Sequence, residues 1–194
     1  MTAHGMEMGI DMRLVPPKHL TAVLATLALG VTGLGALHSA AWASTDGTPG
    51  KKCVTFSGTA VSHLTFHDAG APGPGPGDSL VYHDEIYDAA GTQVAFEDGT
   101  AVLYLDPVDG SLREWLAVDL ELTNGSSIFW YGSESLAGGA AGEKQVLSAV
   151  GTGGELRGMT GTFWFQLLSR PAPDLSLFAG GYTLCNRNPG ESQD

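Results

Sequence analysis

Hydrophobic and polar positions alternate along most of the chain after residue 52, which is the pattern of β-strands with one buried face. Turn-forming residues separate the alternating runs, and Asn124-Gly125 is the clearest hairpin signal among them. No convincing amphipathic helix is visible in this part of the sequence. The pattern predicts strands at 53–66, 80–87, 92–105, 112–122, 127–135, 144–150, 162–169 and 177–185.

Eight short strands separated by turns predict an all-β fold, an eight-stranded antiparallel β-barrel over residues 52–188, with a β-sandwich as the alternative. The count treats 92–105 as one bent strand, made of a run at 92–96 and a second at 100–105. Loops are expected at 70–77 and at 137–142. An eight-stranded barrel has an interior just wide enough for side chains or one small ligand.

The stretch from Gly151 to Leu168 joins a glycine-rich segment to an aromatic run. Glycines this dense permit positive φ angles and close backbone approach, whereas the aromatic residues favour a strand. We therefore expect a sharp corner at 151–161 that leads into the next strand. A nucleotide-binding loop would require a helix after the glycines, and Phe163-Trp164-Phe165 does not favour one.

The first forty-three residues have the features of a secretory signal peptide. Arg13 and Lys18 precede an apolar run at 20–37, and small residues at Ala41 and Ala43 follow it. Met12 is an alternative start, and a retained membrane anchor is the alternative to cleavage. The expected location is outside the cell, secreted or anchored to the membrane, or the cytoplasm if this segment is not a working signal.

The rest of the chain is expected to form a linker at 44–51, the barrel domain and a disordered tail at 189–194. The formal net charge is −12, which disfavours nucleic acids and anionic membranes as partners. An apolar small molecule is the expected ligand, and a homodimer is left open.

The two cysteines, Cys53 and Cys185, lie in the first and last predicted strands. In an exported protein such a pair can persist as a disulfide, and it would join the closing strands of a barrel. Two buried free thiols are the alternative.

Three segments together resemble the allene oxide cyclase/dirigent barrel superfamily: Asp84 to Gly91 (DEIYDAAG), Asp119 to Gly125 (DLELTNG) and Gly151 to Gly161 (GTGGELRGMTG). Their order and spacing are most similar to the small bacterial cyclases that build spirotetronates. The resemblance implies an eight-stranded barrel whose lumen folds a linear polyene of the polyketide (tetronate) type for intramolecular [4+2] cycloaddition, with no metal and no organic cofactor. An exported barrel that binds a phenolic or lipid ligand, as dirigent proteins or lipocalins do, and an allene oxide cyclase-like fatty-acid cyclase are the alternatives.

Such a reaction requires the reacting ends to be held face to face, and a hydrogen bond to a conjugated carbonyl would add activation. The resemblance makes Tyr82 the leading hydrogen-bond donor. Trp130, Tyr131 and Gln145 are further candidates from their residue types. The residues expected to line the substrate site from the resemblance are Glu114, Leu116, Leu147, Phe163, Phe165 and Leu167, and every one of these side chains could equally be ordinary barrel filling.

Other constellations favour no further chemistry. His63 and His67 lie roughly 13 Å apart at strand rise, too far to bind one metal ion, so no metal site is expected. The acidic pairs Asp84-Glu85 and Glu97-Asp98 are interpreted as residues of strand ends and turns. No serine nucleophile motif is present.

Overall fold

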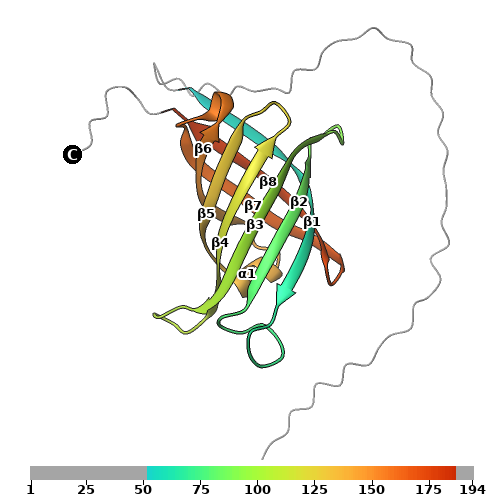
Figure 1. The fold of residues 1–194 in the computed structure, drawn as a ribbon, viewed down its shortest axis with the longest axis vertical. Helices are drawn as coiled ribbons and strands as arrows, with labels where there is room; N and C mark the ends of the chain where they lie inside the picture. Colours follow the sequence, from blue (N-terminus) through green and yellow to red (C-terminus); the bar gives the residue numbers. More distant parts are fainter. Residues whose placement is uncertain (1–51, 187–194) are drawn as a thin grey trace, which may run out of the picture. The chain divides into compact units, whose positions relative to one another are not determined.

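The computed structural model describes residues 52–186, which form a closed antiparallel barrel of eight strands in chain order (Figure 1). The predicted fold is therefore confirmed, and the sandwich is excluded. The signal or anchor segment at 1–43, the linker at 44–51 and the tail at 189–194 lie outside the described residues. The strands are β1 (Cys53–His67), β2 (Ser79–Tyr87), β3 (Gln93–Leu105), β4 (Leu112–Leu122), β5 (Ser127–Ser135), β6 (Gln145–Gly153), β7 (Thr160–Ala172) and β8 (Leu175–Cys185).

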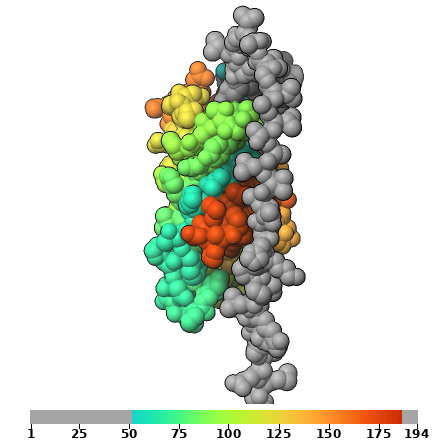
Figure 2. Space-filling view, turned by 90° about the vertical axis from the view of Figure 1, so that its right-hand side faces the viewer, coloured from blue at the N-terminus to red at the C-terminus, as the bar shows by residue number. Residues whose placement is uncertain are grey.

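The barrel closes where β1 pairs with β8, and a disulfide joins the two strands at the end of this seam. Cys53 and Cys185 are direct cross-strand partners, with 4.0 Å between their Cα atoms. The predicted disulfide is confirmed. Figure 2 shows the seam from outside, with the orange-red hairpin of β7 and β8 beside the cyan β1.

Strand β3 runs without a break from Gln93 to Leu105, so the two runs expected at 92–96 and 100–105 form one strand, as predicted. Glu97 and Gly99 continue the buried face of the strand. A Cβ atom at Gly99 would lie 2.4 Å from Val118 Cγ2, so the glycine makes room for the valine of β4. The glycine that suggested an interruption is required by packing.

The glycine-rich corner is present, but its glycines serve different purposes. Gly154 and Gly158 have φ angles of +58° and +79°, which favour glycine, and between them lies a short 3-10 helix (Gly154–Leu156). Gly161 does not have a positive φ angle. A Cβ atom there would lie 1.9 Å from the carbonyl oxygen of Thr183, so close approach of β8 requires the glycine.

The segment expected to be a loop at 137–142 contains a short helix, α1 (Leu136–Ala140), which Figure 1 shows at one end of the barrel. The Ser135 side chain caps it by accepting a hydrogen bond from Gly138 N at 3.1 Å. The expectation of an irregular loop is corrected here. Within residues 52–186, no helix has the length and apolar character needed to cross a membrane.

Candidate functional site

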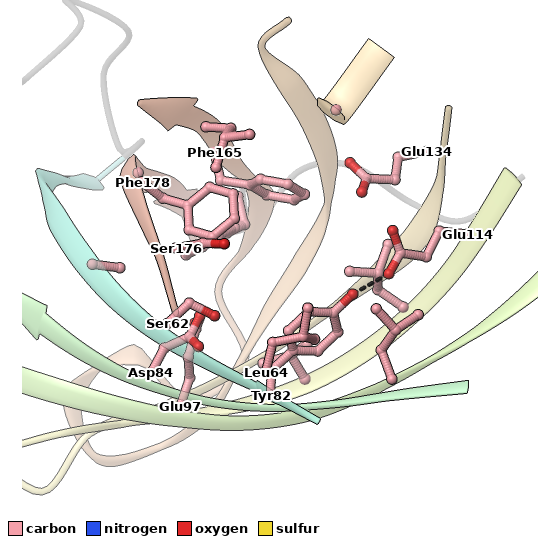
Figure 3. Close-up of a pocket in the computed structure, with 18 of the residues that line it drawn as sticks. Ser62, Leu64, Tyr82, Asp84, Glu97, Glu114, Glu134, Phe165, Ser176 and Phe178 are labelled. Carbon is pink, nitrogen blue, oxygen red and sulfur yellow. Dashed lines mark hydrogen bonds between the residues drawn. The ribbon is translucent and has the colours of Figure 1, made fainter. Parts of the chain in front are cut away.

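The barrel lumen contains a cavity of about 430 Å³, and every strand except β6 contributes to its wall, as does α1 (Figure 3). This volume is within the range of small-molecule binding sites. Inward-facing positions follow the period-2 alternation of each strand. In β2, for example, the cavity is lined by Leu80, Tyr82, Asp84 and Ile86.

One part of the cavity wall is aromatic. The rings of Trp130 on β5 and Phe163 on β7 stack with centroids 4.5 Å apart and an angle of 5° between their planes. Phe165 meets Phe178 of β8 edge to face at 5.9 Å. These contacts hold the rings in fixed orientations, so the wall is a flat, rigid surface for an apolar ligand.

Two pairs of carboxyl groups also face the lumen. Glu114 and Glu134 are direct partners across β4 and β5, and Asp84 and Glu97 are direct partners across β2 and β3. All four side chains line the cavity, and none is more than 7% exposed. Like charges directly opposite each other are unfavourable in a sheet. Each pair must therefore be held together by protons or by hydrogen-bond donors.

In the first pair, the Tyr82 hydroxyl donates a short hydrogen bond to Glu114 Oε1, drawn as a dashed line in Figure 3. Burial raises the pKa of Glu134 to about 9, helped by a hydrogen bond to Glu114. The raised pKa favours the protonated form of Glu134, which can donate to Glu114. Burial beside Glu114 also raises the pKa of the Tyr82 hydroxyl, which keeps its proton. We name this group the Glu114–Glu134 pair.

In the second pair, Trp130 Nε1 donates a hydrogen bond of 3.0 Å to Glu97 Oε2. Burial, then the neighbouring Asp84, raises the pKa of Glu97 well above its usual range, which favours the protonated form of Glu97. Burial also raises the pKa of Asp84, although hydrogen bonds from Glu97 and Ser62 oppose this shift. We name this group the Asp84–Glu97 pair.

Most residues expected at the substrate site do line the cavity, namely Tyr82, Glu114, Leu116, Trp130, Phe163, Phe165 and Leu167. Three do not. Leu147 is buried but lies outside the cavity lining, and Tyr131 is 39% exposed because it follows Trp130 and therefore points outward. The Gln145 side chain donates a hydrogen bond of 3.3 Å to the carbonyl oxygen of Glu143, outside the cavity lining.

The interpretation of the acidic dipeptides was wrong, because Asp84 and Glu97 are lumen residues. Sequence reasoning also missed Glu134 as a lumen residue, and at the cavity wall it missed Ser62, Ser176, Arg170 and Phe178. The missing signal was available in β2, where alternation places Asp84 on the same face as Tyr82. Arg170 Nε donates a hydrogen bond of 3.2 Å to Ser176 Oγ.

Among residues 52–186, no cluster of three or more His, Cys, Asp or Glu side chains is arranged to hold a metal ion. The four lumen carboxyls occur as two separate pairs, and Asp84 Oδ1 in one pair and Glu134 Oε2 in the other are buried without an assigned hydrogen-bond partner. Their geometry therefore directs attention to hydrogen bonding with a ligand.

Comparison with solved structures shows barrels of the same fold. The Diels-Alderase AbmU from Streptomyces koyangensis is 23% identical with a TM-score of 0.60, and the match covers 73% of this chain and 68% of AbmU. AbnU, an exo-specific intermolecular Diels-Alderase, is 21% identical with a TM-score of 0.60, covering 70% of this chain and 98% of AbnU.

The pterocarpan synthase dirigent protein GePTS1 is 12% identical with a TM-score of 0.56, and the match covers 70% of this chain and 91% of GePTS1. At these identities the similarity establishes the fold alone. No curated protein matches the sequence significantly. Residues 59–175 match the family described as the allene oxide cyclase barrel like domain, and the chain belongs to that family.

Proposed function

We propose that this protein is a cyclase that folds a linear polyene of the polyketide (tetronate) type in its lumen for intramolecular [4+2] cycloaddition. The observation that carries the proposal is the cavity of about 430 Å³, with a rigid aromatic wall and a few buried polar groups. A cycloaddition within one molecule requires no nucleophile. It requires the diene and the dienophile to be held in contact, which such a wall can achieve.

The Glu114–Glu134 pair supplies the polar contact that orients the substrate. The Tyr82 hydroxyl donates its hydrogen to Glu114 and not to the substrate, so Tyr82 acts as a residue that positions Glu114. Glu134 lies beside α1, where a Cβ atom at Gly139 would be 3.3 Å from Glu134 Oε1. A hydroxyl or enol group of the substrate can donate to the carboxyl oxygens of this pair, and the polyene chain then lies along the aromatic wall.

The charge of the lumen helps to separate the alternatives. Two acidic pairs disfavour a fatty-acid carboxylate, whose negative charge would lie near them in a low-dielectric cavity. The same acceptors suit a phenol hydroxyl, so a barrel that binds a phenolic ligand is the second candidate.

The test is a cyclisation assay with the purified protein and a linear tetronate-type polyene, following the loss of conjugated absorbance and the formation of the ring product. The informative variant is Leu116→Trp, since Leu116 is 3% exposed and lines the cavity. The added volume fills the lumen, and we expect turnover to fall at least about 100-fold, with a stability cost of roughly 1–3 kcal/mol.

Val81→Trp is the matched control, because Val81 is 43% exposed on the same barrel and does not line the cavity. It should keep wild-type turnover. A folded Leu116→Trp variant with normal turnover would refute catalysis in the lumen. Binding of phenols with no conversion of any polyene would favour the second candidate.

A further inference from the structure

The Asp84–Glu97 pair has more hydrogen-bond acceptors than donors. The Trp130 N–H donates to Glu97 Oε2, and Glu97 and Ser62 are the hydrogen-bond partners of Asp84. Among the described residues, Asp84 Oδ1 is the atom of this pair without an assigned partner.

This deficit occurs in a buried place that faces the cavity. Asp84 is 7% exposed and Glu97 5%, and both side chains line the lumen. A buried acceptor without a donor destabilises the folded protein, and a ligand that brings a donor can remove this cost. Ser62 and Ser176, direct partners across β1 and β8, extend the polar surface beside Asp84, and Figure 3 shows them together.

The two acidic pairs are spaced along one strand. Tyr82, which holds the first pair, and Asp84, which belongs to the second, are two residues apart on the inner face of β2, about 7 Å at strand rise. Figure 3 shows Tyr82 extending away from Asp84 toward Glu114. The lumen therefore presents two separate acceptor sites to a single elongated ligand.

We infer that Ser62, Asp84, Glu97 and Trp130 form a second anchoring site in the lumen, which binds a hydroxyl group of the ligand. This inference rests on the proposed function and makes it more specific. The substrate is then a polyene with a hydroxyl or enol group near each end, one held by the Glu114–Glu134 pair and the other by the Asp84–Glu97 pair. Hydroxyl groups fit both sites, because each pair has a buried carboxyl oxygen without an assigned hydrogen-bond partner, Asp84 Oδ1 or Glu134 Oε2.

The experiment is a binding titration with two matched compounds, a linear octatriene with a hydroxyl group at each end and its mono-methyl ether. The ether keeps both oxygens but has one hydroxyl hydrogen fewer. Wild-type protein should bind the diol about tenfold more tightly than the ether, which is the value of one buried hydrogen bond. Binding is followed by calorimetry, so no turnover is needed.

In Asp84→Leu the preference for the diol should fall below about threefold, while affinity for the ether stays within about threefold of wild type. Asp84→Ala, which adds no bulk, should give the same result if the leucine variant does not fold. Asp84→Asn keeps an acceptor oxygen and should retain most of the preference. Asp119→Leu, on the exposed face of β4, is the matched control and should behave as wild type.

The possible failures are distinct. If the wild type binds the ether and the diol equally, or if both Asp84→Leu and Asp84→Ala keep the tenfold preference, the second site is refuted and the proposed cyclase is untouched. If the wild type binds neither compound while the cyclisation assay is positive, the second site is again refuted. If neither compound binds and no cyclisation occurs, the proposed function and the second site are both wrong.

Discussion

The two acidic pairs of the lumen have the same design but different surroundings. Each consists of carboxyl groups placed opposite each other on neighbouring strands, and each receives one hydrogen bond from an aromatic side chain, Tyr82 or Trp130. The Asp84–Glu97 pair has Ser62 as a further donor. The Glu114–Glu134 pair has α1 beside it and Arg113 near enough to oppose the upward shift in the pKa of Glu134.

This difference indicates different roles. Trp130 is fixed by its stack on Phe163, so the Asp84–Glu97 pair is attached to the rigid aromatic wall. Burying carboxyl groups face to face costs free energy, and a retained proton reduces this cost. Under the proposed function, the Glu114–Glu134 pair orients the substrate and the Asp84–Glu97 pair fixes its far end.

Among variants that affect only one of the two acidic pairs, Tyr82→Phe is expected to have the largest effect, which is on the rate of cyclisation. The variant keeps the ring and removes only the hydroxyl that donates to Glu114. If the Glu114–Glu134 pair orients the substrate in the transition state, cyclisation should slow by about 10- to 100-fold. Tyr104→Phe is the control, since Tyr104 shares its hydroxyl hydrogen bond with Ser133 and does not line the cavity. Equal rates for Tyr82→Phe and wild type would remove Tyr82 from the mechanism.

Much of this architecture was predictable from the sequence. Alternation and turn residues are local signals, so they placed β4 and β5 at their observed bounds, and the family resemblance placed Glu114, Phe163 and Phe165 in the lumen. The family resemblance pointed to Tyr82. The pairing of Cys53 with Cys185 followed from the expected neighbourhood of the first and last strands in a closed barrel.

The acidic pairs were not predicted, for a physical reason. Seen in one strand alone, an acidic residue is expected at the surface. Its burial becomes energetically tolerable only when a residue on another strand shares a proton or a hydrogen bond with it, as Glu97 does opposite Asp84. That partnership depends on strand register, which local patterns do not determine. The error at Tyr131 has a simpler cause, because it was selected for its residue type although its neighbour Trp130 already occupied the inward position.

A smaller effect is expected on the pH dependence of stability, through the ionisation of Glu134. Glu134 keeps its proton up to a pKa of about 9 in the folded protein, whereas the unfolded chain releases it near 4.5. Between these values the folded state binds more protons than the unfolded state, so the free energy of unfolding decreases as the pH rises. The stability due to this proton is complete below pH 4.5 and is lost as the pH passes 9.

Melting temperatures measured from pH 5 to pH 9 should therefore decrease less in Glu134→Gln than in wild type, by at least about 3 °C. The amide is neutral throughout and can donate to Glu114 at every pH. Glu121→Gln, on the exposed face of β4, should follow the wild-type curve. Parallel curves for Glu134→Gln and wild type would show that Glu134 is ionised in the folded protein.

The smallest effect is expected from Ser62→Ala, which removes one donor and leaves the Asp84–Glu97 pair with an aromatic donor, as in the Glu114–Glu134 pair. Ser62 is 1% exposed, so water cannot easily replace its hydroxyl. The loss should reduce the free energy of unfolding by about 1 kcal/mol in urea titrations. It should also increase the preference for a ligand that supplies a hydroxyl hydrogen, because Asp84 then loses the Ser62 donor while its Oδ1 still has no partner. Ser57→Ala, on the exposed face of β1, should change neither quantity.

If Ser62→Ala weakens diol binding instead, then Ser62 contacts the ligand directly, and the assignment of Ser62 as a donor to Asp84 must be revised.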